Sequence, residues 1–408
     1  MLTSICGINW GDEGKGRMVD LLSRDFDIVC RYQGGNNAGH TVINEKGKFI
    51  LNLLPSGILR DDVVNVLRNA GIKITPENLK ISDKAVITMP YNVLQDIMEE
   101  DRLSKATGKP YGSTRRGIAP IYADKYMKKA FRMGELLNTK LMFKRLPDIV
   151  AWKNLTVGAY GYDPVKVEDM IDYLTTYGEP LKEFITDTGV FLNEAHKAGK
   201  NIMFEAQLGA LRDIDYGIVP YTSSSSTIAA YAPIGAGVPN LRLDKSIGIM
   251  KAYSSCVGAG PFTCEYFGEK AERLRELGGE YGAATGRPRR VGPFDVVASR
   301  YGIRCQGADE IALTKLDVLD DYEEIEICTH YELDGKRIDE FPFTDVLDFC
   351  KPVFEKVKGW HCDITGCRKP EDLPKEALDY IKLLEKLCEC RIRYVSVGAE
   401  RESCIKMY

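Results

Sequence analysis

Helical segments alternate with short apolar, β-branched segments along the whole chain, and this alternation constrains the fold more than any other feature of the sequence. The first unit is a predicted strand over residues 2–8, a glycine-rich turn, and a helix whose apolar stripe is formed by Met18, Val19, Leu21 and Leu22. The order of strand, turn and helix is typical of α/β proteins.

The same order returns in two later regions. A helix predicted from Pro180 to Lys197 precedes a strand at 201–205, and a helix predicted over 373–389 precedes a strand at 391–397. The sequence therefore predicts an α/β fold with a large, mostly parallel central sheet and helices on both faces. Ligand-binding residues are expected in the turns that follow the carboxyl ends of the strands.

Composition limits the class of protein. The 408 residues contain no Pro/Ser-rich spacer, charge block or repeat, so we expect a single domain over residues 1–408. With 55 Lys+Arg against 59 Asp+Glu, the formal net charge of −4 argues against nucleic-acid binding. No apolar run approaches the ~18 residues of a membrane span, and no secretory leader follows Met1, so we expect a cytoplasmic protein. The twelve scattered cysteines suit reduced thiols better than disulfides.

The turn over residues 7–16, GINWGDEGKG, predicts a phosphate-binding loop similar to a P-loop, because it links a strand to a helix N-terminus. It differs from the Walker A pattern at Asn9 and Gly16, where that pattern has glycine and serine or threonine. A plain tight turn is the alternative. Asp12 makes that alternative less attractive, because a carboxylate beside phosphates is useful only if it binds a metal or moves a proton.

Three further clusters lie where ligands are expected. Residues 33–41, QGGNNAGHT, combine amides, glycines and His40 in one predicted loop, and the glycines favour a ligand contact over a structural histidine. Thr314 to Asp317, TKLD, follows a predicted strand and suits guanine, whose N1–H and amino group both donate to one carboxylate. A pattern of only four residues also occurs by chance, so TKLD by itself is weak evidence for guanine binding. Residues 283–290, AATGRPRR, predict either an anion-binding loop or a solvated basic loop.

These clusters, in this order, resemble the adenylosuccinate synthetase family, whose members join aspartate to IMP with GTP. The resemblance extends over nearly the whole chain and includes the strings WGDEGKG, CRYQGGNNAGHT, LNLLPSGIL, RRGIAPIYADK, DIDYG, KAYSSCVGAGPF, TGRPRR, TKLDVLD and SVGAERE. It implies that Asp12 is the base that removes the N1 proton of IMP, and that His40 is the acid beside the transferred γ-phosphoryl group. It also implies Mg²⁺ bound by Asp12 and the carbonyl of Gly39, and a 6-phosphoryl-IMP intermediate.

The resemblance assigns residues to three substrates. GTP is expected at Gly11, Asp12, Glu13, Gly14, Lys15, Gly16, Arg17, Gly39, His40, Thr41, Arg289, Lys315, Leu316, Asp317, Ser396, Val397 and Gly398. IMP is expected at Asp12, Glu13, Gly14, Lys15, Asn37, Ala38, Gly39, His40, Thr114, Lys128, Gln207, Ser223 and Arg287. L-Aspartate is expected at Ala283, Ala284, Thr285, Gly286, Arg287, Pro288 and Arg289. Lys128 is expected to reach the IMP site of a second subunit, which implies a homodimer.

Several positions differ from the usual family pattern. Gln207 and Leu208 occupy a stretch where the family places the amide that contacts IMP one position later, so either residue could face the base. Lys128 replaces a common arginine, Arg115 a usual glycine and Pro288 a usual arginine. These differences affect the recognition of IMP more than the chemistry.

A larger difference follows Leu67, where the family usually continues through a Gly-Asn-Gly turn and a helix. This chain continues directly with RNAGIKITPE. Loss of a turn near the nucleotide could weaken activity.

Two other functions remain open. A GTP-binding regulatory module would need the phosphate loop and TKLD, but neither a base such as Asp12 nor a second anion-binding loop. A related ligase acting on another purine monophosphate would differ around Leu208 and Arg115. Omission of each substrate in turn separates these functions.

Overall fold

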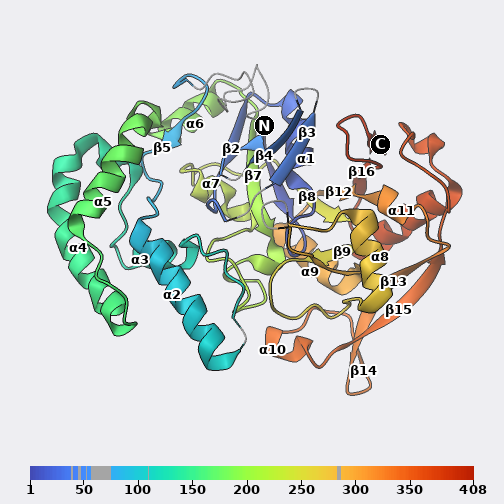
Figure 1. The fold of residues 1–408 in the computed structure, drawn as a ribbon. Helices are drawn as coiled ribbons and strands as arrows, with labels where there is room; N and C mark the ends of the chain where they lie inside the picture. Colours follow the sequence, from blue (N-terminus) through green and yellow to red (C-terminus); the bar gives the residue numbers. More distant parts are fainter. Residues whose placement is uncertain (38–39, 45–46, 52, 57–74, 109, 283–285) are drawn as a thin grey trace.

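The computed structural model describes residues 1–37, 40–44, 47–51, 53–56, 75–108, 110–282 and 286–408, and for residues 40–50 only the backbone. Its centre is a seven-stranded sheet whose neighbours all pair in parallel except the last, antiparallel pair at one edge (Figure 1). From edge to edge the strands are β17 (Cys404–Lys406), β16 (Ile392–Ser396), β12 (Glu310–Thr314), β8 (Lys245–Lys251), β1 (Leu2–Gly7), β7 (Ile202–Gly209) and β2 (Ile28–Arg31). The predicted mostly parallel sheet is confirmed.

Helices cover both faces of this sheet. On one face, Met18 and Val19 of α1 (Lys15–Leu22) pack against Ile5 and Ile249. The other face is covered by α6 (Thr188–Lys197), α7 (Ala232–Gly235), α9 (Val296–Gln306) and α11 (Lys375–Cys388). Successive side chains of a strand point to opposite faces of the sheet. Because helices cover both faces, the central strands carry apolar side chains on both sides.

A group of helices lies to one side of the sheet, on the left of Figure 1. It consists of α2 (Pro90–Thr107), α3 (Ile118–Tyr126), α4 (Thr139–Ala159) and α5 (Val167–Tyr173), and it has its own apolar core around Tyr91, Phe131 and Leu146. Inside it, Lys153 Nζ pairs with Asp124 Oδ1 at 2.6 Å, and both side chains are buried. This ion pair fixes α3 to α4.

A second sheet lies on the opposite side of the central one (Figure 1). It contains β11 (Phe294–Asp295), β13 (Glu324–Leu333), β14 (Lys336–Ile338) and β15 (Lys351–Lys358), with α10 (Thr344–Leu347) before β15. Between the two sheets lie α8 (Gly268–Gly278) and the pair β9 (Ser254–Cys256) and β10 (Arg290–Gly292). Two short pairs complete the fold: β3 (His40–Asn44) with β4 (Gly47–Leu51), and β5 (Ile81–Ser82) with β6 (Ile185–Thr186).

The helix predicted to begin at Pro180 is wrong at its start. Residues 179–184 form a 3₁₀ turn, β6 follows, and the α-helix begins only at Thr188. Asp187 caps this helix, because its Oδ1 accepts a hydrogen bond from Val190 N at 3.1 Å. The stronger N-cap and the pairing of β6 with β5 set the boundary, not the proline.

Two other expectations can be compared with the structure. All twelve cysteines are described and all are free thiols, as predicted. Within the described part of the chain, no helix is both long enough and apolar enough to cross a membrane.

Candidate functional site

The predicted phosphate turn follows β1 and ends at Gly14, whose φ of 94° places it in the left-handed region just before α1. Glu13 folds into this turn and accepts hydrogen bonds from Gly11 N at 2.7 Å and from Lys15 Nζ at 2.6 Å. Thr314, at the end of β12, donates to the carbonyl of Glu13 at 2.6 Å. The turn is therefore fixed to the end of β12. The charge of Lys15, which was expected to face a phosphate, is paired with buried Glu13.

Gly11 illustrates why this turn needs glycine. Its φ is 101°, and a Cβ atom at this position would lie 3.3 Å from the Cα of Leu208. Leu208 itself has a φ of 63° and lies at the irregularity where β7 pairs with β1. Leu208, one of the two candidates for contact with the IMP base, therefore packs beside the phosphate turn.

Asp12 projects from the turn and meets the arginine segment. Its Oδ2 lies 3.1 Å from Arg289 Nε, and the Asp12 side chain is 31% exposed. Arg289 in turn donates from Nη1 to Oε2 of Glu280 at 2.8 Å. Burial acts to lower the pKa of Arg289, but the carboxylates of Asp12 and Glu280 outweigh it and raise that pKa. Arg289 thus stays charged between two carboxylates.

The amide cluster after β2 is joined to β7 and to the serine segment. Gln207 exchanges hydrogen bonds with the backbone of Gly35, with both distances at 3.1 Å, and its carbonyl accepts from Gln33 Nε2 at 2.7 Å. Gln33 also accepts from Ser225 Oγ at 2.9 Å, and Ser225 lies 3.2 Å from Ser223 Oγ. Gln207 and Ser223, predicted to contact one ligand, are therefore members of one hydrogen-bonded wall.

The predicted guanine element follows β12 as expected. Lys315 has a φ of 59°, and its Nζ donates to Glu280 Oε1 at 2.9 Å. Asp317 has a buried Oδ1 that finds no hydrogen-bond partner among the described residues. Burial raises the pKa of Asp317, while the nearby charges of Arg17 and Lys315 act against that rise. A buried carboxylate oxygen without a donor is a strong acceptor site for a ligand.

Arg17 joins this element to the last predicted segment. Its guanidinium donates to Ser396 Oγ and to the backbone carbonyls of Glu400 and Ser403. Burial lowers the pKa of Arg17 from its usual value. The segment from Ser396 to Gly398 therefore lies beside α1, the helix that follows the phosphate turn.

The three arginines of the fourth cluster have different surroundings. Arg287 is exposed, and a methyl group at Gly112 would lie 3.9 Å from its Nη1. Arg289 faces Asp12. Arg290 begins β10 and donates from Nε to Glu265 at 2.9 Å, so it belongs to the packing around β10. The expectation that this cluster binds anions is therefore restricted to Arg287 and Arg289.

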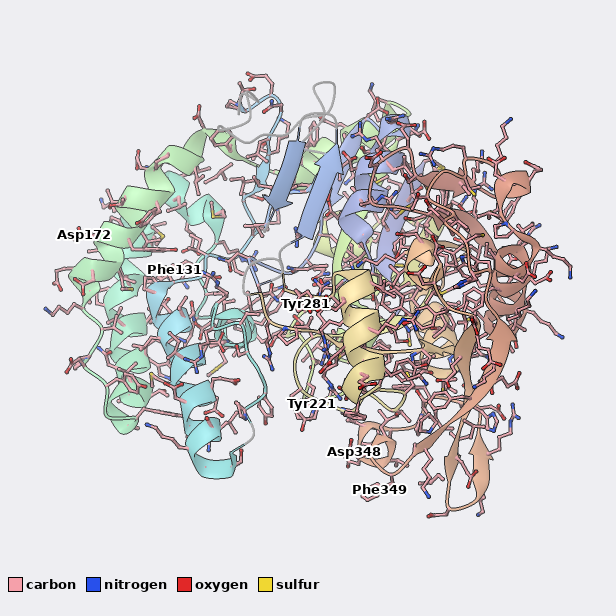
Figure 2. The ribbon with its side chains drawn as sticks, turned by 45° about the vertical axis from the view of Figure 1, so that its right-hand side comes forward. Phe131, Asp172, Tyr221, Tyr281, Asp348 and Phe349 are labelled. Atoms are coloured by element: carbon pink, nitrogen blue, oxygen red, sulfur yellow. The ribbon has the colours of Figure 1, made fainter. Side chains whose placement is uncertain are left out.

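The segment after α2 approaches Arg287 from the helical side. Glu100 accepts hydrogen bonds from Gly112 N at 2.6 Å and Ser113 N at 2.9 Å. Asp96 accepts from Ser113 Oγ at 2.6 Å and Gly117 N at 2.8 Å. These two buried carboxylates, one helical turn apart, shape the segment that carries exposed Thr114. Tyr221, labelled in Figure 2, packs edge-on against Tyr111, with ring centroids 6.0 Å apart.

Some predicted residues cannot be placed. Ala38, Gly39, Ala283, Ala284 and Thr285 lie outside the described residues, as does the difference after Leu67. His40 and Thr41 are described only as backbone, and they begin β3. The expectation that His40 belongs to a loop is therefore wrong, because the hairpin β3–β4 starts directly at this residue. Asn37 is described, and its Oδ1 accepts from Gly35 N at 3.2 Å. Lys128 is exposed just after α3, with a φ of 63°.

Three carboxylates at this site were not predicted from the sequence: Glu280, Asp96 and Glu100. Each acts through contacts with other segments of the chain, and a single glutamate or aspartate, on a helix or just after one, carries no local signal. Glu100 and Asp96 do share the four-residue spacing that places two side chains on one helix face.

The carboxylates of the site bear on whether it can hold Mg²⁺. Among the described residues, no three His, Cys, Asp or Glu side chains group closely enough to form a metal site by themselves. Mg²⁺ in phosphoryl-transfer sites is commonly bound by one or two carboxylates together with the substrate phosphates. The partly exposed carboxylate of Asp12, in the phosphate turn, fits that kind of ligand set.

Comparisons with known proteins agree on one family. The sequence model of the family described as adenylosuccinate synthetase matches residues 4–405. The adenylosuccinate synthetase of Streptococcus gordonii is 40% identical over 416 residues, which cover 98% of this chain and 96% of that protein. That of Prochlorococcus marinus is 42% identical over 420 residues, which cover 98% and 95%.

Two solved structures are similar as well. The fully ligated adenylosuccinate synthetase of Plasmodium falciparum superposes with a TM-score of 0.93 at 32% identity, covering 100% of this chain and 99% of that one. The succinoaminodeoxyadenylate synthetase PurZ of cyanophage S-2L, bound to dGMP and to dATP as an energy donor, has a TM-score of 0.59 at 16% identity, covering 99% and 95%. The second likeness shows the fold alone.

Proposed function

The chain belongs to the adenylosuccinate synthetase family of purine-biosynthetic ligases, and we propose that it joins L-aspartate to IMP with GTP as the energy source. The products are adenylosuccinate, GDP and phosphate. The observation that carries this proposal is the meeting of Asp12 and Arg289, 3.1 Å apart, at the phosphate turn. A base in the phosphate turn beside a second anion-binding segment suits a ligase, whereas a nucleotide switch needs no such base.

The proposed reaction has two steps. In the first, Asp12 accepts the N1 proton of IMP, and O6 attacks the γ-phosphorus of GTP, so that GDP leaves and 6-phosphoryl-IMP forms. In the second, the amine of aspartate attacks C6, the C6–O bond breaks, phosphate leaves and the amine loses a proton. Activation is needed because the 6-oxygen of a lactam is a very poor leaving group. We assign to His40 the hydrogen bond to the transferred phosphoryl group.

Mg²⁺ would be bound by Asp12 and the carbonyl of Gly39, together with the nucleotide phosphates. When bound, it neutralises charge on those phosphates during transfer. The protein residues position the partners. The Gln33–Gln207–Ser223 wall is assigned to IMP, and the pair Arg287 and Arg289 to the carboxylates of aspartate.

GTP is assigned to the phosphate turn, to Asp317 and to the segment from Ser396 to Gly398. The unpartnered Oδ1 of Asp317 supports guanine, because guanine supplies donors where adenine does not. The fold by itself does not decide the nucleotide, since the cyanophage protein with a similar fold was bound to dATP as an energy donor.

We also propose a homodimer in which Lys128 reaches the IMP site of the second subunit. Lys128 is exposed and lies two residues after the end of α3, in the left-handed backbone region. An exposed cation suits a role in a neighbouring copy.

The test is phosphate release from GTP in the presence of IMP, aspartate and Mg²⁺, with each component omitted in turn. The proposal requires all of them. Release that persists without IMP and aspartate would instead indicate a GTP-hydrolysing regulatory module. The second candidate, a ligase for another purine monophosphate, is tested by replacing IMP with dGMP, GMP or XMP. The observation in its favour is that the side-chain amide of Gln207, a candidate for contact with the IMP base, is hydrogen-bonded to the backbone of Gly35 instead.

A further inference from the structure

Glu280 is a fully buried carboxylate at the centre of the proposed site, and none of the roles above includes it. It follows α8 directly after Gly279, whose φ of 57° ends that helix. Its side chain is 0% exposed. The next residue, Tyr281, is labelled beside α8 in Figure 2.

The two oxygens of Glu280 bind different parts of the site. Oε1 accepts from Lys251 Nζ at 2.7 Å and from Lys315 Nζ at 2.9 Å, and it also accepts from the hydroxyl of Tyr253. Oε2 accepts from Arg289 Nη1 at 2.8 Å. One carboxylate therefore joins the end of β8, the proposed guanine element and the arginine segment.

The charges around Glu280 explain why it is ionised. Burial alone would raise its pKa, but Lys251, Lys315 and Arg289 outweigh burial and lower the pKa below its usual range. For Lys251, burial lowers the pKa to about 8, although the negative charge of Glu280 acts to raise it. Three cations thus meet one buried anion, and a neutral residue here would leave buried Lys251 without an opposite charge and Arg289 with Asp12 alone.

Glu280 also determines which edge of Arg289 faces the site. It accepts from Nη1, and its own backbone carbonyl accepts from Arg289 N at 2.8 Å. The Nε of Arg289 then lies 3.1 Å from Asp12 Oδ2, yet it is buried and makes no hydrogen bond with the described residues. The guanidinium is therefore held by Glu280 with its Nε directed at the carboxylate of Asp12 in the proposed site.

We propose that Glu280 is a positioning residue that holds the guanine element and the anion-binding edge of Arg289 in register with each other. This inference rests on the proposed function, because it concerns how GTP and aspartate are bound together. Glu280 itself touches neither substrate. Its effect should therefore appear at both of these substrates and not at IMP, whose assigned side chains Gln33, Gln207 and Ser223 are joined to one another through the Gln207 carbonyl and Ser225.

The test compares Glu280→Gln with a matched control, Glu265→Gln. Glu265 pairs with Arg290, a neighbouring arginine outside the proposed site, at 2.9 Å. Because the amide variant of Glu280 could fold poorly, a double variant Lys251→Met with Glu280→Gln removes one cation together with the anion. Each protein is measured for its unfolding midpoint, kcat, and KM for GTP, aspartate and IMP.

For Glu280→Gln we expect kcat/KM for aspartate to fall about 10- to 100-fold, the range for loss of one charge-assisted hydrogen bond. KM for GTP should rise as well, KM for IMP should stay near wild type, and the control should stay within about 3-fold of wild type, as for a charge outside the site. The double variant should recover the midpoint without recovering aspartate use.

Three results would overturn the positioning role. These are kinetics of Glu280→Gln that match the control, a double variant that regains both stability and activity, and loss of the fold in both Glu280 variants. An inactive wild-type enzyme would instead refute the proposed function, so the two failures are distinguishable.

Discussion

Replacement of Asp317 by asparagine should change the nucleotide that drives the reaction. In the structure, Oδ1 of Asp317 is buried and has no hydrogen-bond partner among the described residues. Guanine would supply two donors, N1–H and the 2-amino group. Asparagine keeps the shape but replaces one acceptor by a donor, which opposes the guanine amine and suits the 2-oxygen of xanthine.

The size of the effect follows from those two bonds. A hydrogen bond to a charged group contributes about 1.5 to 3 kcal/mol, so two contribute about 3 to 6 kcal/mol. At about 1.4 kcal/mol per factor of ten, wild type should prefer GTP over ATP by about 10²- to 10⁴-fold. Only ionised Asp317 accepts both bonds. Since burial raises its pKa, GTP should bind more weakly as pH falls through that raised value.

The assay is kcat/KM for GTP, ATP and XTP at fixed IMP, aspartate and Mg²⁺. Asp320→Asn is the matched control, because Asp320 lies in the same turn but accepts from Trp360 Nε1 at 2.7 Å and Ile364 N at 3.1 Å. The control should lose stability and keep the nucleotide preference. Equal use of ATP by wild type, or an unchanged ratio of GTP to XTP in Asp317→Asn, would refute the guanine assignment.

Three further predictions test other parts of the site and the fold. Asp12→Ala should abolish phosphate release with a nearly unchanged unfolding midpoint, because its partly exposed side chain contributes little packing. If each active site uses Asp12 of one subunit and Lys128 of the other, mixing Asp12→Ala subunits with Lys128→Ala subunits should restore activity. Failure to restore activity would argue against shared sites. Glu100→Gln should loosen the segment after α2 that carries Thr114 and raise KM for IMP by about 10-fold, within the range for a lost charge-assisted hydrogen bond. The control Glu99→Gln breaks an exposed ion pair and should leave KM for IMP unchanged. Burial raises the pKa of Cys6 from 9.0 to about 12, so the folded state keeps a proton that the unfolded chain releases. The unfolding midpoint should therefore fall as pH rises from 9 toward 12. Cys6→Ala should make that fall less steep, and an identical slope would show that Cys6 does not contribute to it.

Periodicity in the sequence was sufficient to predict a mostly parallel α/β sheet and several of its strands and helices, but not β8, β17, α7 or α9. The helix predicted over 373–389 is observed as α11, with Ile381 and Leu384 buried, and the predicted strand that follows it is β16. The turn over residues 7–16 and the segment from Thr314 to Asp317 follow strands as predicted, because the apolar pattern of each strand is complete within the chain segment itself. Local patterns are reliable where local structure and burial have the same cause.

Prediction failed where tertiary pairing decided the outcome. The helix start moved from Pro180 to Thr188 because β6 pairs with β5, which lies about a hundred residues earlier in the chain. His40 begins a strand because the following residues return as β4. Neither partner strand can be identified from the residues next to the error.

The string of residues 287–290 shows why chemistry is harder to predict than fold. It places three arginines within four positions, and any of them could bind an anion. The structure separates them by the carboxylate that each one meets: Arg290 meets Glu265 and is used in packing, while Arg289 lies between Glu280 and Asp12. Arg287 remains exposed toward the segment after α2. The guanidinium groups are chemically identical, so their roles are set by the acids that other segments bring to them. A substitution of Glu280 should therefore change the behaviour of Arg289 more than a substitution of the neighbouring Pro288 does.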